Sequence, residues 1–130
     1  MSSIFTKIVE GHIPAYKIAE NDDFLAFLDI NPLAKGHTLV IPKKEVDYIL
    51  DIENKLYKDL FVFAKKVGKA IDKAMPCKRV GISVIGLEVP HAHIHLIPIN
   101  TIYDMDFKRE KLKFSHEEFE QIVKDIQSYL

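Results

Sequence analysis

The chain has 130 residues, 48% of them apolar and 28% charged, with a formal net charge of −1 at pH 7. This composition is typical of one soluble globular domain, and the near-zero charge argues against nucleic acid or an anionic membrane as a partner. No apolar stretch approaches a membrane span, and the first residues lack the apolar core of a signal peptide. The single cysteine, Cys77, provides no disulfide framework, so we expect a cytoplasmic protein.

The first third of the chain predicts a short helix followed by strands. Apolar residues recur at helical spacing over residues 4–10, where Ser3 can cap the helix and Gly11 ends it. Short runs of apolar and β-branched residues bounded by turn residues come next. We expect strands over residues 16–19, 24–30 and 36–42.

A long helix is predicted over residues 54–75, because apolar residues form two adjacent stripes along it. So wide an apolar surface must be buried or pack against another chain, which favours a homodimer. Strands are then expected over residues 79–85 and 91–98, joined by a short loop and therefore antiparallel. An irregular C-terminal wrap, residues 99–113, leads to a final helix over residues 116–130. The order of elements indicates one α+β domain on a mainly antiparallel sheet.

Three of the six histidines, His91, His93 and His95, alternate with apolar residues in the last predicted strand. Successive side chains of a strand point to opposite faces, so the three imidazoles should share one face, about 7 Å apart. Such groups titrate near neutral pH and can act as nucleophile, acid or base. A solvated strand face is the plain alternative. A metal site is another, although zinc sites need further ligands and Glu88 is the nearest carboxylate.

Two further polar residues stand beside predicted strands. Asp29 lies between apolar residues before the Asn-Pro turn, as either a turn residue or a functional carboxylate. His37 begins the next strand, as either a hydrogen-bonded core histidine or the partner that orients an active imidazole. The residues alone favour the core histidine.

Several segments together resemble the histidine triad (HIT) family, in its HINT-like branch. The triple-histidine strand, residues 27–32 (Phe-Leu-Asp-Ile-Asn-Pro) and residues 36–43 (Gly-His-Thr-Leu-Val-Ile-Pro-Lys) look like family motifs in order and spacing. Residues 3–14 are similar to the family's N-terminal segment. The resemblance covers about residues 3–98 and implies a single HIT domain over residues 1–130. That fold is a homodimeric α+β arrangement with a five-stranded sheet, a long helix and a C-terminal helix.

The resemblance implies a nucleotide-binding protein, usually for purines, that cleaves at the α-phosphate. His93 would be the nucleophile, because a neutral imidazole attacks phosphorus well and the P–N bond formed is labile. His95 would contact the phosphate and assist at the leaving group. His91 and His37 would support them. Asp29 would accept hydrogen bonds from the ribose, and a slot for the base would be formed by Ile8, Ile13, Phe27, Leu28 and Ile30.

The chain departs from the family pattern at the zinc site that many bacterial members carry. The two cysteine positions hold Ser3 and Thr6, and the downstream histidine position holds Glu45. All three changes remove a zinc ligand, so the resemblance implies a member without that metal, and we expect no cofactor. His91, the fourth ligand in those members, would then make only local hydrogen bonds.

The loop before the triple-histidine strand also departs from the pattern. It is shorter than in the family, and it carries Glu88 where phosphate-binding residues are usual. Backbone N–H groups near Glu88 and Val89 could still hold phosphate oxygens, but an ionised Glu88 would repel a phosphate.

We therefore expect a hydrolase or transferase that acts on nucleoside phosphoramidates or related nucleotidyl substrates through a covalent nucleotidyl-histidine. The alternatives are a nucleotide-binding interaction module with little catalysis and a metal site on the triple-histidine strand.

Overall fold

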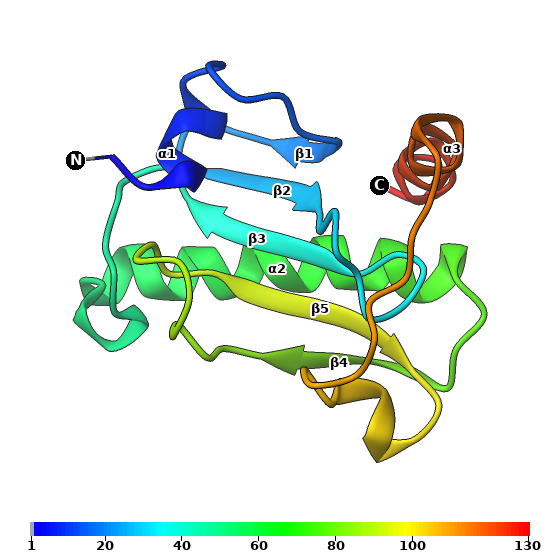
Figure 1. Cartoon of the computed structure of the whole chain (residues 1–130). Helices are drawn as coiled ribbons and strands as arrows, with labels where there is room; N and C mark the ends of the chain where they lie inside the picture. The colour runs from blue at the N-terminus through cyan, green and yellow to red at the C-terminus, as the bar shows by residue number, and fades with distance from the viewer. Residues whose placement is uncertain (1) are drawn as a thin grey trace.

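A five-stranded antiparallel sheet forms the centre of the computed structural model, which describes residues 2–130 (Figure 1). The strand order is β1-β2-β3-β5-β4, and every neighbouring pair is antiparallel. The bounds are β1 Lys17–Glu20, β2 Phe24–Leu28, β3 Thr38–Pro42, β4 Arg79–Ser83 and β5 Ile94–Ile99. This confirms the predicted α+β class and the pairing of the last two strands.

Within residues 2–130, three α-helices flank the sheet: α1 Ile4–Val9, α2 Asn54–Ala74 and α3 His116–Gln127. The side chain of Ser3 caps α1 by accepting the backbone N–H of Thr6. Ser115 and Glu118 form the capping box of α3, in which each side chain accepts the backbone N–H of the other residue. Within residues 2–130, no helix is long and apolar enough to cross a membrane.

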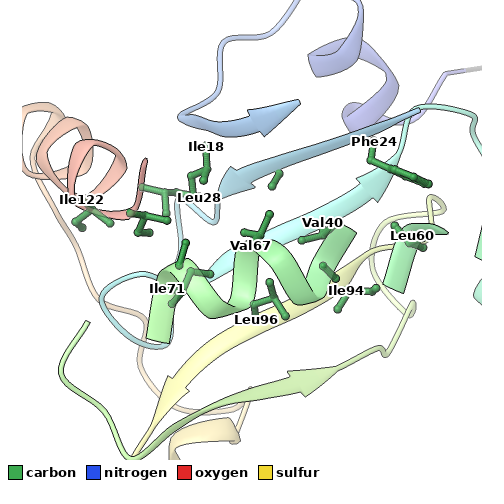
Figure 2. Packing of buried hydrophobic residues seen from close by; sticks show 14 of the residues in the cluster. Ile18, Phe24, Leu28, Val40, Leu60, Val67, Ile71, Ile94, Leu96 and Ile122 are labelled. Carbon is green, nitrogen blue, oxygen red and sulfur yellow. The ribbon is translucent and has the colours of Figure 1, made fainter. Parts of the chain in front are cut away.

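The two faces of the sheet are buried by different groups. On one face α2 lies along the strands, and its Leu60, Val67 and Ile71 belong to one cluster with Val40, Ile94 and Leu28 of the sheet (Figure 2). On the other face a smaller cluster joins α1 to the first three strands, through Phe5, Ile8, Leu25, Phe27, Leu39 and Ile41. Side chains alternate between these clusters along β2, so every residue of this strand is buried.

Several element ends differ from the sequence-based expectations. The last strand begins at Ile94 rather than His91, so His91 and His93 lie in the bend that precedes β5, where the Ala92 N–H donates to the Val46 carbonyl at 2.7 Å. Both side chains are nevertheless buried on the same side as His95, because Phe5 packs against His91 and His93, and His93 packs against His95. The predicted common face is therefore present. Two 3-10 turns were not predicted, at Ile49–Asp51 and Ile102–Met105.

Candidate active site

A cavity of about 380 Å³ opens on the face of the sheet opposite α2. His37, His93 and His95 line it together with Asp29 and Asn31, which follow β2. The loop before the histidines contributes residues 85–88, and the C-terminal wrap contributes Phe107, Lys108 and Lys111. Three of the four histidines assigned to catalysis and two of the eight residues assigned to nucleotide binding, Asp29 and Glu88, thus lie around one cavity.

The hydrogen bond at Nδ1 determines the tautomer of His93. This nitrogen lies 2.8 Å from the backbone carbonyl of His91. A carbonyl oxygen can only accept, so Nδ1 carries the proton and Nε2 of the neutral ring carries the lone pair. His93 is 6% exposed, and Phe5 holds the ring edge-on at 5.0 Å between centroids. The arrangement suits a neutral nitrogen nucleophile.

His37 and His95 form a directed pair. The backbone N–H of Leu33 donates to His37 Nδ1 at 3.0 Å, so Nε2 of the neutral His37 ring carries the proton. Nε2 donates in turn to His95 Nδ1 at 3.0 Å, which leaves His95 with its proton on Nε2. Burial lowers the pKa of His37 to about 3 and that of His95 to about 4, so both rings are neutral at pH 7. His95 therefore offers a fixed N–H donor beside His93.

His91 lies behind His93 and does not line the cavity. Its Nε2 donates to the Pro42 carbonyl at 2.7 Å, and its Nδ1 accepts the hydroxyl of Ser3 at 2.8 Å. Burial lowers the pKa of this imidazole. His91 thus supports the site through its backbone, because its carbonyl holds His93, and its ring fixes that backbone in place.

Ser3, Thr6, Glu45 and His91, the four positions singled out for zinc, lie together as a hydrogen-bonded cluster. Glu45 accepts the Thr6 hydroxyl at 2.6 Å and the Ser3 backbone N–H at 2.7 Å. These bonds, that of Thr6 first, lower the pKa of Glu45 to about 2. The donor set does not fit zinc, because two of the four positions offer only neutral hydroxyls. The lone pair on His91 Nδ1 already accepts a hydrogen bond from the Ser3 hydroxyl. Elemental analysis should find no zinc in the purified protein.

Asp29 is a turn residue whose carboxylate also reaches the buried histidines. One carboxylate oxygen accepts the Asn31 backbone N–H at 2.8 Å, which is the turn, while the other lies 3.6 Å from His37 Nε2. Burial raises its pKa. Asp29, His37 and His95 each offer one ligand atom, and these three atoms lie within 4.8 Å of one another. A metal ion would therefore find its ligands here rather than in the three alternating histidines. One nitrogen each of His37 and His95 is already engaged in the hydrogen bond between them.

The residues expected to hold the base are only partly brought together. Ile8, Ile13, Phe27 and Val89 belong to the apolar cluster beside the histidines. Leu28 points to the other face and packs in the α2 cluster, as Figure 2 shows, because side chains alternate along β2. Ile30 is 62% exposed. The expectation that all five form one slot is therefore wrong for Leu28, and for Ile30 it stays a prediction.

Several lining residues were missed by the sequence reasoning. Phe107, Lys108 and Lys111 lie in a polar segment with no periodicity, and nothing in the sequence indicates that it turns back over the histidines. Asn31 and Leu87 lay in stretches already singled out, and both border the cavity.

Comparisons with known proteins agree on one family. The HIT domain family model matches residues 10–102. An uncharacterized HIT-like protein of Borreliella burgdorferi is 37% identical over 131 residues, covering 95% of this chain and 94% of that protein. Adenosine 5'-monophosphoramidase from Schizosaccharomyces pombe is 38% identical and covers 98% of each chain. A crystal structure of a Hit-like protein from Bartonella henselae superposes with a TM-score of 0.87 at 30% identity, covering 99% of this chain and 96% of that one.

Proposed function

This chain belongs to the HIT family of nucleotide-binding hydrolases, and we propose that it cleaves nucleoside phosphoramidates or related nucleotidyl substrates at the α-phosphate through a covalent nucleotidyl-His93. A purine nucleotide is the favoured substrate class. The observation that carries the proposal is the bond from His93 Nδ1 to the His91 carbonyl, which leaves the Nε2 lone pair for attack.

The first step forms a bond between His93 Nε2 and the α-phosphorus. The bond from phosphorus to the leaving group breaks, and its electron pair leaves with the departing nitrogen or oxygen, which takes up a proton. The His93 ring becomes cationic in this step. Its Nδ1–H remains bonded to the His91 carbonyl, an acceptor that stabilises the positive charge.

His95 supplies an N–H donor where negative charge develops. Because Leu33 and His37 fix its tautomer, Nε2–H is available to a phosphate oxygen or to the leaving atom without reorganisation. In the second step water attacks the phosphorus of the nucleotidyl-histidine, the P–N bond breaks with its electron pair returning to His93 Nε2, and the nucleoside monophosphate is released with neutral His93 restored. The proton that water loses passes to solvent and balances the one that the leaving group took up.

The test is a panel of nucleoside phosphoramidates with His93→Ala as control. We expect turnover of the purine compounds by the native chain and a loss of at least 10³-fold in His93→Ala, with an unchanged circular dichroism spectrum. No turnover of any compound in the panel by the native chain would contradict the proposal.

A second candidate function, nucleotide binding with little catalysis, is favoured by the position of Glu88. Its carboxylate borders the same cavity as Asp29, which places two acidic residues where an anionic substrate would bind. If repulsion by Glu88 limits the reaction, Glu88→Ser should raise kcat/KM for a phosphoramidate by about tenfold, a factor that corresponds to ~1.4 kcal/mol. Tight nucleotide binding without turnover in both proteins would support the binding-module function instead.

We also propose that the chain is a cytoplasmic homodimer. Strand β4 is an edge strand, and the groove between it and α2 is lined by apolar residues that include Phe61, Val80 and Ile82, and by charged residues that include Lys65 and Arg79. Ile82 is 58% exposed in the single chain. The single free cysteine suits a reducing compartment.

A further inference from the structure

The C-terminal wrap supplies one border of the cavity, although the family model ends at residue 102, before Phe107, Lys108 and Lys111. Phe107 packs edge-on against His95 at 4.8 Å and against His37 at 6.4 Å between ring centroids. These contacts cover the His37–His95 pair. The wrap therefore takes part in the site, beyond connecting β5 to α3 (Figure 1).

The wrap is fixed in place at both ends. Near its start, Asp104 accepts the backbone N–H groups of Asn100 and Thr101 at 2.7 and 2.9 Å. Met105 lies close over Gly81 of β4, where an added Cβ would be only 3.0 Å from its sulfur. Near its end, the Leu112 N–H donates to the Pro32 carbonyl at 2.8 Å, which ties the wrap to the loop that carries Asp29. Its side chains thus face the cavity from an ordered backbone.

Lys111 is held as a fixed positive charge. Its ammonium donates to the backbone carbonyls of Phe107 and Arg109, which leaves one of its three donors free. The positive charge of Lys111 acts on two groups of the site. It lowers the pKa of Asp29, against the larger effect of burial, and it adds to the effect of burial in lowering the pKa of His37. Within residues 2–130, neither Lys111 nor the exposed Lys108 has a carboxylate within ion-pair distance.

Asp29 and Glu88 border the same cavity, but neither forms an ion pair with Lys108 or Lys111, so the two ammonium groups of the wrap remain available to an anionic ligand group. The histidines already account for the α-phosphate. We propose that Lys108 and Lys111 bind a second anionic group of the substrate, so that this site prefers nucleotides with a further phosphate-like charge. This inference rests on the proposed function for the location of the α-phosphate. The second charge can come from the leaving-group side or from a ribose phosphate.

The test measures binding rather than turnover, so it decides the inference even if catalysis is absent. Calorimetry would compare AMP, ADP and adenosine 3′,5′-bisphosphate, in which the second phosphate lies on the α-phosphate or on the ribose. We expect either ADP or adenosine 3′,5′-bisphosphate to bind the native chain about tenfold more tightly than AMP, and this preference to fall with added salt. Tighter binding of ADP would place the second charge on the leaving-group side, and tighter binding of the 3′,5′-bisphosphate would place it on the ribose.

The variants are Lys108→Met and Lys111→Met, singly and together, with Lys113→Met as the matched control on the same segment outside the cavity. The double variant should lose the preference, and Lys113→Met should keep it. Lys111→Arg should restore most of it, which separates lost charge from a loosened wrap.

Equal affinities of the native chain for AMP, ADP and adenosine 3′,5′-bisphosphate would overturn the inference and leave the proposed function standing. A preference that survives in the double variant would also overturn it. Failure of all three nucleotides to bind would overturn both proposals together.

Discussion

At the scale of single residues, hydrogen bonds distinguish four histidines that the sequence presents as near equivalents. The His91 carbonyl accepts a hydrogen bond from His93 Nδ1–H and so keeps the proton on that nitrogen, and the Leu33 amide sets the tautomers of His37 and His95 in turn. Spacing predicted the common face, but not these partners, since the Leu33 amide and the Pro42 carbonyl are backbone groups without a sequence pattern. His37, which the residues alone assigned to the core, is both buried and the partner of His95.

The buried pair predicts a pH dependence of stability. An unfolded histidine has a pKa near 6.5, whereas burial lowers the pKa of His37 to about 3 and that of His95 to about 4. Below pH 6.5 the unfolded chain therefore binds more protons, and the free energy of unfolding falls as pH falls from about 6.5 toward 4. At pH 5 the loss should be about 2 kcal/mol for each histidine.

Urea unfolding at pH 7 and pH 5 measures this loss. The control is His37→Gln, whose amide can still donate to His95 but does not titrate, and whose loss between the two pH values should be smaller by the contribution of one histidine, about 2 kcal/mol. An identical pH dependence in the native chain and in His37→Gln would show that the pair does not titrate as described.

At the scale of elements, the N-terminus of α1 is joined to the histidine segment through Ser3. The same hydroxyl that caps the helix donates to the buried His91 ring, and Glu45 closes the cluster from the loop after β3. The sequence located these four positions through the family's zinc ligands. The sequence could not show that these residues remain together without the metal, because the spacing of hydroxyl and carboxylate residues along the chain does not predict their hydrogen bonds.

Ser3→Ala should destabilise the chain by roughly 2–3 kcal/mol, since it removes a helix cap and leaves His91 Nδ1 without its donor. Ser115→Ala is the matched control, because Ser115 caps α3 at an exposed position without a buried partner. Denaturant unfolding of both variants isolates the contribution of the imidazole. Equal losses in the two variants would mean that the bond to His91 contributes nothing.

The C-terminal wrap is the element that sequence reasoning described least. An ordered but irregular segment was expected, and the structure contains one, with a 3-10 turn. The path of the wrap depends on two long-range contacts, Met105 over Gly81 and Leu112 with Pro32. The periodicity of the local sequence predicts neither contact. For the same reason Lys108 and Lys111 could not be assigned to the site beforehand.

At the scale of the whole molecule, the two edges of the sheet are treated differently. Beside β1 lies α3, where Phe119 stacks on Tyr16 at 4.7 Å between ring centroids (Figure 1). Strand β4 forms the other edge, and within residues 2–130 no strand pairs with its outer side. An open edge beside an apolar groove is a site for pairing with another chain. The wide apolar surface of the long helix had already favoured such a partner.

The homodimer is tested by Ile82→Asp, which places a charge in the groove between β4 and α2. The native chain should sediment as a dimer at micromolar concentrations, and the variant as a folded monomer, because an unpaired buried charge is costly. Ile102→Asp is the control, as Ile102 is 83% exposed and lies outside the groove. A native chain that stays monomeric across this range would contradict the dimer.

The account as a whole depends on His93 acting as the nucleophile. Intact-protein mass spectrometry of a reaction with a slow nucleoside phosphoramidate, quenched at alkaline pH, tests this role most directly. We predict a nucleotidyl adduct that forms and decays during turnover, maps to the peptide containing His93, and is absent in His93→Ala. Full turnover by His93→Ala, or an adduct on a different residue, would contradict the account.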